Sequence, residues 1–287
     1  MNGILPWNWW LDGAALHIRL DEAQIRATED PALRRVMLLG NGAALHHLST
    51  ALTAFGWASD ITRLPDPVDP NYLAILHLTP YTATRDEFSL AGAIFHRKSQ
   101  HHHRFRRWEM PPNLIRSIRG STNGTRAAAR HVPDTLRRDL AGAYRAAAET
   151  RNEYGEFLAG VGDRVDQRDP GGEPPAPPLE PTFADPFPDR RPDAAELLVL
   201  CTPGDDRAAH LSAGIAASSI LLTATRNGLA GALLTQTMKV PEVRSGVRDS
   251  VLYDCAYPHA LIRVGRPVNS EAGRGYVRAF PGLDAAI

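Results

Sequence analysis

The sequence predicts a globular chain that mixes helices with short strands and carries one helix–turn–strand unit twice. Three observations lead to this prediction: a hairpin signal near the start, a capped apolar helix after it, and a later segment that resembles that helix. With 287 residues, the chain exceeds the ~100–200 residues that are usual for one domain. One large domain and two fused parts are therefore both open at this point.

Strands are predicted where aromatic and branched residues cluster in short runs. The first two runs flank Asp12-Gly13, a dipeptide that tolerates the positive φ angles of a two-residue hairpin turn. A turn at Pro65-Asp66-Pro67 separates the next two runs. The runs lie at 7–11, 15–20, 61–64, 73–78, 197–201 and 260–264. The chain is therefore expected to form strands near both of its ends.

A long helix is predicted after the hairpin. Asp30 can cap it, and Pro31 suits the first helical position because its missing N–H is not needed there. The helix is expected to run to about Phe55, with Gly56 closing it. An apolar stripe supports this length, since leucine recurs at helical spacing at Leu38, Leu45, Leu48 and Leu52.

A second helix is predicted near residue 214, and it resembles the first. Gly42 is followed fourteen residues later by Gly56-Trp-Ala58, and Gly214 is followed at the same spacing by Gly228-Leu-Ala230. Asp205-Asp206 can cap this second helix. Small-residue helices that end in glycine can resemble one another by chance, which is the alternative, but we favour an internal duplication.

Composition excludes several classes of protein. Hydrophobic residues make up 43% of the chain, and 32 basic residues balance 32 acidic ones, so neither a disordered chain nor a global attraction to nucleic acid or anionic membrane is expected. The longest weakly polar run, 211–224, is shorter than the ~20 residues of a spanning helix. Cys201 and Cys255 form no C-x-x-C motif and are expected to be buried thiols. With no leader-like start, a cytoplasmic location is expected.

Two segments between the predicted helices have unusual composition. Residues 96–107 (HRKSQHHHRFRR) combine five cations and four histidines with no acid, which suits either an anion site or a solvated face. Residues 170–192 hold nine of the 23 prolines, which favours a stiff linker or a lid.

Other chemistries find weak support. Gly40-Asn-Gly42 with Asp60 beyond it could be a dinucleotide fingerprint, but Leu45 replaces the third glycine. No metal site is expected, because 101–103 and His46-His47 are adjacent histidines without partners at ligand spacing. The chain has no G-x-S-x-G elbow either.

Three phrases of the chain resemble the Acg-like branch of the nitroreductase superfamily, whose single chains carry two nitroreductase-like halves in place of a homodimer. Residues 93–101 (AIFHRKSQH) are similar to A-I-x-x-R-R-[ST]-x-R, which begins the second half in that branch, and 111–114 (PPNL) resemble the P-P-x-x-L that follows. Residues 228–241 (GLAGALLTQTMKVP) resemble G-L-A-x-x-x-L-T-Q-x-x-E-x-P. PWxW at 6–9 and LPDP at 64–67 extend the likeness over nearly the whole chain.

The resemblance implies an α+β, nitroreductase-like fold in which two fused, related halves form a pseudo-dimer around a mixed antiparallel sheet. The implied halves are residues 1–90 and 91–287, with a proline-rich lid at about 160–192. The usual dimer contact would then be internal, so a monomer is expected. This chain departs from the pattern of the branch in two ways. It lacks the first helix, and it has His101 and Lys239 where the family has an arginine and an acid.

The resemblance also implies FMN between the halves, NAD(P)H as co-substrate and a nitroaromatic or quinone-like small molecule as electron acceptor. A flavin-sequestering stress protein without catalysis is the alternative. Because the flavin carries the hydride chemistry, no catalytic side chain is expected. The phosphate is expected near Arg97, Ser99 and Arg274, and the flavin ring along 228–236. The implied FMN-binding residues are Arg97, Lys98, Ser99, His101, Gly228, Leu229, Leu234, Thr235, Gln236 and Arg274.

Overall fold

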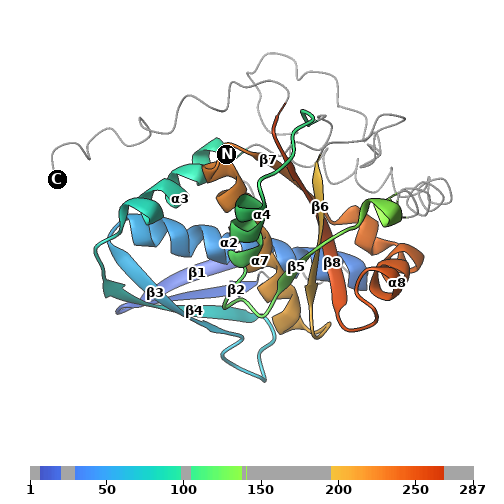
Figure 1. Ribbon diagram of the computed structural model, residues 1–287. Coiled ribbons are helices and arrows are strands. Elements are labelled where there is room, and N and C mark those ends of the chain that lie inside the picture. The colour runs from blue at the N-terminus through green and yellow to red at the C-terminus, as the bar shows by residue number, and fades with distance from the viewer. Residues whose placement is uncertain (1–6, 21–29, 98–104, 138–139, 141–194, 268–287) are drawn as a thin grey trace, which may run out of the picture.

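Two four-stranded sheets lie on either side of a pair of long central helices in the computed structural model of the chain (Figure 1). The structure describes residues 7–20, 30–97, 105–137, 140 and 195–267. Among the residues implied to bind FMN, Lys98, Ser99, His101 and Arg274 lie outside these ranges, as does the proline-rich segment.

The first sheet contains strands β1 (Trp7–Asp12), β2 (Ala15–Leu20), β3 (Trp57–Arg63) and β4 (Tyr72–Pro80) in the order β1-β2-β4-β3. Neighbouring strands in this sheet pair in antiparallel fashion. The predicted hairpin is confirmed, since Asp12 pairs with Ala15 and Gly13 has a φ of 56°. Alternate residues of β2 (Leu16, Ile18 and Leu20) are buried, which directs one face of the sheet to the core.

The second sheet repeats this layout with β5 (Ala128–His131), β6 (Glu196–Thr202), β7 (Ala230–Leu234) and β8 (Tyr257–Gly265) in the order β5-β6-β8-β7. Neighbouring strands in the second sheet are also antiparallel. Across each sheet the strands follow the order first, second, fourth, third of their order in the chain. The strand that follows the long helix, β3 or β7, therefore lies at an edge of its sheet.

The α+β class is confirmed, but the expectation of one mixed antiparallel sheet is wrong. The two sheets are separate because each packs its apolar face on a different central helix, α2 (Pro31–Ala54) or α7 (Arg207–Arg226). Leu38 and Leu45 of α2 join the core of the first sheet, whereas Ile220 and Leu221 of α7 join that of the second. The helix pair therefore lies between the sheets.

Both central helices begin at the predicted caps. The Asp30 carboxylate accepts a hydrogen bond from the Ala32 N–H at 2.8 Å, and Asp206 accepts one from Ala209 at 2.8 Å. Gly40 and Gly42 lie inside α2 and not in a strand-to-helix turn, which excludes the dinucleotide fingerprint there. The residues before Gly40 are helical because α2 already starts at Pro31.

Four further elements surround this frame: α3 (Arg85–His96), α4 (Pro112–Gly120), the 3-10 helix η1 (Gln236–Lys239) and α8 (Pro241–Ser250). A capping box starts α3, where Thr84 and Glu87 bond each other's backbone N–H groups. The other face of the second sheet is covered by η1 and α8, which pack on it through Met238, Val243 and Val247.

Cys201 is buried as expected, but Cys255 is exposed, because it lies in the turn between α8 and β8.

Within the described ranges, α7 is long and apolar enough to cross a membrane, with a mean hydropathy of 1.3. Because 78% of that apolar window is buried inside the protein, α7 has the character of a core helix.

Candidate functional site

The contact between α2 and α7 is centred on two glycines. A Cβ atom at Gly42 would overlap the Leu211 carbonyl group, and one at Gly214 would overlap the Leu39 carbonyl group. Both overlaps are with helix backbone, which cannot rotate away as a side chain can. The two glycines therefore let the helix backbones approach more closely than any other residue would allow.

A second pair of residues continues this contact one turn further along both helices. Nδ1 of His46 lies 2.8 Å from Oγ of Ser218. The separation in sequence between His46 and Ser218 equals that between Gly42 and Gly214, and between Gly56 and Gly228 at the helix ends. Equivalent positions of the two helices thus meet each other, as they do across a two-fold axis.

Burial at this contact keeps His46 neutral. Burial, with a smaller effect of the neighbouring His47, lowers the pKa of His46 from 6.5 to about 4. The folded state therefore binds fewer protons than the unfolded chain between these two pH values. Stability from the neutral imidazole is complete above pH 6.5 and is lost as the pH falls toward 4.

His46→Gln should make the protein less sensitive to acid. A pKa difference of this size corresponds to up to about 3 kcal/mol of folding free energy. We expect the loss of stability between pH 7 and pH 4, measured by urea unfolding, to be smaller in the variant by up to that amount. His77→Gln, at an exposed position of β4, is the control and should keep the wild-type slope. Equal slopes in the two variants would contradict the assignment.

Arg97 follows the last turn of α3 and is half-buried beside α2. Its backbone N–H still bonds the Ala93 carbonyl, but its φ and ψ of −68° and 120° turn the chain out of the helix. Burial lowers its pKa, and its charge in turn lowers the pKa of His47, after the larger effect of burial there. The Arg97 guanidinium and the His47 imidazole are therefore neighbours.

Both side chains carry a buried nitrogen without a hydrogen-bond partner. Nε of Arg97 and Nε2 of His47 are enclosed and find no partner among the residues that the structure describes. An unsatisfied donor on a buried cation is costly, and an anion is the group that satisfies it best. Arg97 and His47 thus form a place suited to a negatively charged ligand.

The residues implied to line a flavin ring form the turn and strand after α7. Gly228 has a φ of 72° and bonds Thr225 at the helix end, while the Leu229 side chain is buried in the core of the second sheet. Leu234 is half-buried against the core beneath η1. Thr235 and Gln236 begin η1 and are also half-buried. Gly228 and Leu229 thus have structural roles, at the helix end and in the core, that need no bound flavin.

The two parts of the implied FMN site lie along the same helix. η1 is attached to α2 through Arg35, whose guanidinium donates to the Met238 carbonyl at 3.0 Å. Arg97 is close to His47, twelve residues further along α2. This separation is about 18 Å along the helix axis, so α2 spans the interval between the two parts.

A hollow of about 290 Å³ lies between the first sheet and α2. Its lining is apolar except for Asn41 and consists of Trp7, Trp9, Leu16, Ile18, Asn41, Ala44, Leu45 and Leu48. Among the implied FMN-binding residues that the structure describes, none lines this hollow. The candidate anion site at Arg97 is therefore separate from it.

Sequence reasoning identified Arg97 but missed its neighbours. The sequence suggested His46 and His47 only as metal ligands, and it gave no role to Ser218, the partner of His46. The signal that could have found them was the equal spacing of the two glycine-containing helices, which places position 46 opposite position 218 once the helices pair.

Several proteins of Mycobacterium tuberculosis are similar to the chain in sequence. Rv3131, named as a candidate NAD(P)H nitroreductase, is 32% identical over 286 residues, covering 93% of this chain and 81% of the relative. A second protein with that kind of name, acg, is 29% identical over 296 residues, covering 91% and 83%. Rv3127, an uncharacterized protein, is 28% identical over 285 residues. No family model matches the chain.

Solved structures give a weaker likeness. The FMN-dependent nitroreductase NfnB from Mycobacterium smegmatis in complex with NADPH has a TM-score of 0.45 and 19% identity, covering 69% of this chain and 96% of the other. A nitroreductase with bound FMN from Bacteroides fragilis has a TM-score of 0.42 and 14% identity, covering 62% and 88%. The assignment to a family rests on the sequence relatives. With Rv3131 similar over nearly the whole length, the chain belongs to the nitroreductase superfamily.

Proposed function

We propose that the chain is an FMN-dependent NAD(P)H oxidoreductase of nitroreductase type. It would accept electrons from NAD(P)H and pass them to a nitroaromatic or quinone-like small molecule. Membership of the nitroreductase superfamily supports the reaction class, and the names of two relatives point the same way. A further support for FMN binding is the pair of unsatisfied nitrogens on Arg97, at the end of α3, and on His47, in α2.

The proposal includes two related halves that form a pseudo-dimer. Its support is the matching strand order of the two sheets and the meeting of equivalent positions where α2 crosses α7. A boundary near residue 90 and a monomeric chain follow from this proposal, because the contact that joins two subunits elsewhere would lie inside one chain. FMN would lie in the seam between these halves.

The observation that carries the proposal is the pair of buried nitrogens on Arg97 and His47. The FMN phosphate is a dianion that needs charge-assisted donors, and Arg97 is half-buried, with its Nε enclosed and unsatisfied among the described residues. A neutral His47 can donate from its Nε2 once an acceptor is present. The residues present therefore fit the phosphate end of this cofactor.

When bound, FMN would supply the hydride chemistry. Arg97 would anchor the phosphate and so fix the cofactor along α2. The segment from Leu234 to Gln236 would approach the ring from the end of β7. Burial of Arg97 beside α3 would keep water from competing for its guanidinium, which strengthens a charge-assisted hydrogen bond.

An absorbance experiment tests the proposal. The purified full-length chain is loaded with FMN, freed of excess cofactor and titrated anaerobically with NADPH, and a nitroaromatic compound is then added. We expect one yellow chromophore per chain, bleaching by NADPH and recovery of the colour with the nitro compound.

Two other results would contradict the proposal in different ways. A protein that retains FMN but whose yellow colour persists under both NADH and NADPH would be a flavin-sequestering protein and not an oxidoreductase. A folded protein that cannot be loaded with FMN would exclude both functions. Circular dichroism of the same sample shows whether the chain is folded.

A further inference from the structure

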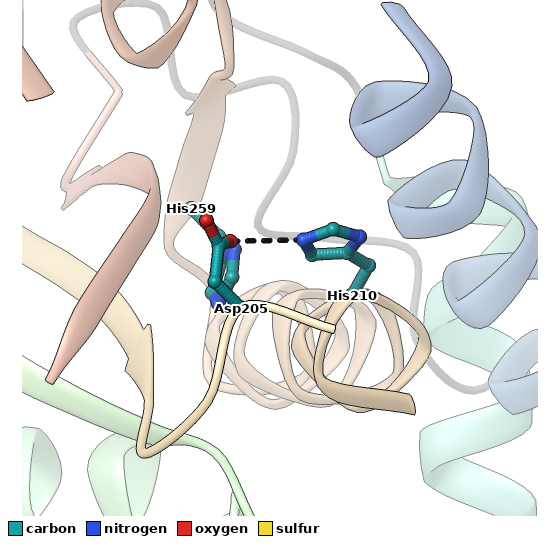
Figure 2. Close-up of side chains that lie close together, drawn as sticks. All are labelled: Asp205, His210 and His259. Atoms are coloured by element: carbon teal, nitrogen blue, oxygen red, sulfur yellow. Dashed lines mark hydrogen bonds and ion pairs between the residues drawn. The ribbon is translucent and has the colours of Figure 1, made fainter. Parts of the chain in front are cut away.

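Three residues from different parts of the second half converge at the start of α7 (Figure 2). Asp205 lies just before the helix, His210 lies in its first turn, and His259 comes from β8. One nitrogen of each imidazole and one carboxylate oxygen of Asp205 lie within 4.8 Å of one another. The proposed FMN-binding residues take no part in this cluster.

The hydrogen bonds of His259 show which of its nitrogens carries the proton. The Thr202 hydroxyl donates its one proton to the Gly204 carbonyl at 2.7 Å, so it can only accept from Nε2 of His259. Nδ1 of a neutral His259 is then left with a lone pair. This atom is buried and has no hydrogen-bond partner in the described part of the chain.

His210 faces Asp205 through a nitrogen that is already hydrogen-bonded. Its Nε2 lies 3.0 Å from Oδ1 of Asp205, and because an ionised carboxylate only accepts, Nε2 must carry the proton. Nδ1 of His210 is also buried without a partner in the residues described. An ion shared by Asp205 and His210 would therefore contact Nε2 of His210, with the ring proton moving to Nδ1, and it would contact His259 at the free lone pair of Nδ1.

Electrostatics keep the three groups in their ligating forms. Burial, with a smaller effect of His210, lowers the pKa of His259 to about 3. Burial alone would raise the pKa of Asp205, but hydrogen bonds from Arg244 and His210 outweigh it and lower that pKa to about 2. Neutral imidazole and ionised carboxylate are the forms that bind metal ions.

The charges around the cluster are mixed. Arg244 bonds Asp205 at 2.6 Å, and Arg35 is near enough to affect the pKa of both histidines. Asp30, Asp205 and the capping Asp206 oppose these two cations. A divalent ion would share Asp205 with Arg244, so Arg244 should weaken binding without preventing it.

We propose that Asp205, His210 and His259 bind a divalent transition-metal ion of the Zn²⁺ type. Two imidazoles and one carboxylate with a position left for water form a common zinc donor set, whereas Mg²⁺ and Ca²⁺ prefer oxygen ligands alone. The hydrogen bond between Nε2 of His259 and Thr202 resembles the outer contacts that orient histidines at metal sites. The site would connect the start of α7 to β8.

Calorimetric titration of the chelator-treated full-length chain with Zn²⁺ tests this proposal, with Co²⁺ as a spectroscopic probe and Mg²⁺ as a negative control. We expect one ion per chain at micromolar affinity and visible absorption from bound Co²⁺. His210→Ala and His259→Gln should each weaken Zn²⁺ binding more than about tenfold. Arg244→Gln should strengthen it, because a competing cation is removed.

Two control variants separate this site from other histidines. His131→Ala removes an exposed histidine that is paired with Glu196 at 2.8 Å, and it should leave Zn²⁺ affinity unchanged. Alanine at 101–103 should do the same. The proposal is overturned if no Zn²⁺ binds, if His210→Ala binds it as tightly as the wild type, or if binding disappears with the 101–103 variant. FMN loading is measured on the same samples and is expected to be unaffected, so this test and that of the oxidoreductase proposal can fail separately.

Discussion

Alanine at Gly42 or Gly214 is expected to lower the free energy of unfolding by about 3 kcal/mol. The added Cβ would overlap a backbone carbonyl of the opposite helix in both variants, so α2 and α7 would have to move apart. Each helix carries part of the apolar core of one sheet, and separation would open both cores. Urea unfolding followed by circular dichroism measures the loss.

Gly40→Ala is the matched control for this prediction. Gly40 lies in the same helix two residues earlier, and nothing lies within 4 Å of where its Cβ would be. Because alanine is the better helix former, this variant should be stabilised by up to about 1 kcal/mol. If the alanine variants at 40 and 42 have equal stability, close approach of the two helices is not what Gly42 provides.

Arg97→Ala is expected to weaken FMN binding by about 10- to 100-fold, which corresponds to the ~1.5–3 kcal/mol of one charge-assisted hydrogen bond. The cause is the loss of a half-buried guanidinium whose enclosed Nε has no partner among the described residues. Fluorescence titration of the FMN-free chain with FMN gives the dissociation constant. Arg97→Lys should be intermediate, because it keeps the charge but loses the planar donor group.

The stability of the FMN-free variant separates binding from a structural role. If Arg97 serves only the cofactor, its removal should leave the unfolding free energy of the FMN-free chain unchanged or slightly higher, since an unsatisfied buried donor disappears. Arg85→Ala, at an exposed position of the same helix, should leave FMN affinity at the wild-type value. Unchanged affinity in Arg97→Ala would assign the basic residues of 96–107 to a solvated face.

Features with a local cause were predictable from the sequence. Asp12-Gly13 dictates its turn through backbone conformation, and Asp30 and Asp206 cap their helices through bonds to residues two and three positions away. The repeated glycine spacing predicted a pair of similar helices, and Gly42 and Gly214 prove to be in contact. Such signals depend only on residues near one another in the chain or on a visible repeat.

Features that depend on distant partners were not predictable. The division into two sheets arises because α2 and α7 pack on each other, and no local pattern encodes that contact. From the sequence, His46 was weighed only as a metal ligand, because nothing near it in the chain predicts that α7 brings Ser218 beside it. Likewise, His259 is 49 residues from His210 in the sequence, a spacing that resembles no ligand motif. Only the fold brings β8 to the start of α7.

A crystal structure of the full-length chain grown with FMN is the most direct test of the central claim, that this chain holds FMN in the seam between two related halves. We expect the phosphate within hydrogen-bonding distance of the Arg97 guanidinium and the ring between the halves, near Thr235 and Gln236. FMN bound on an outer face of either sheet, with Arg97 making no contact to its phosphate, would contradict it.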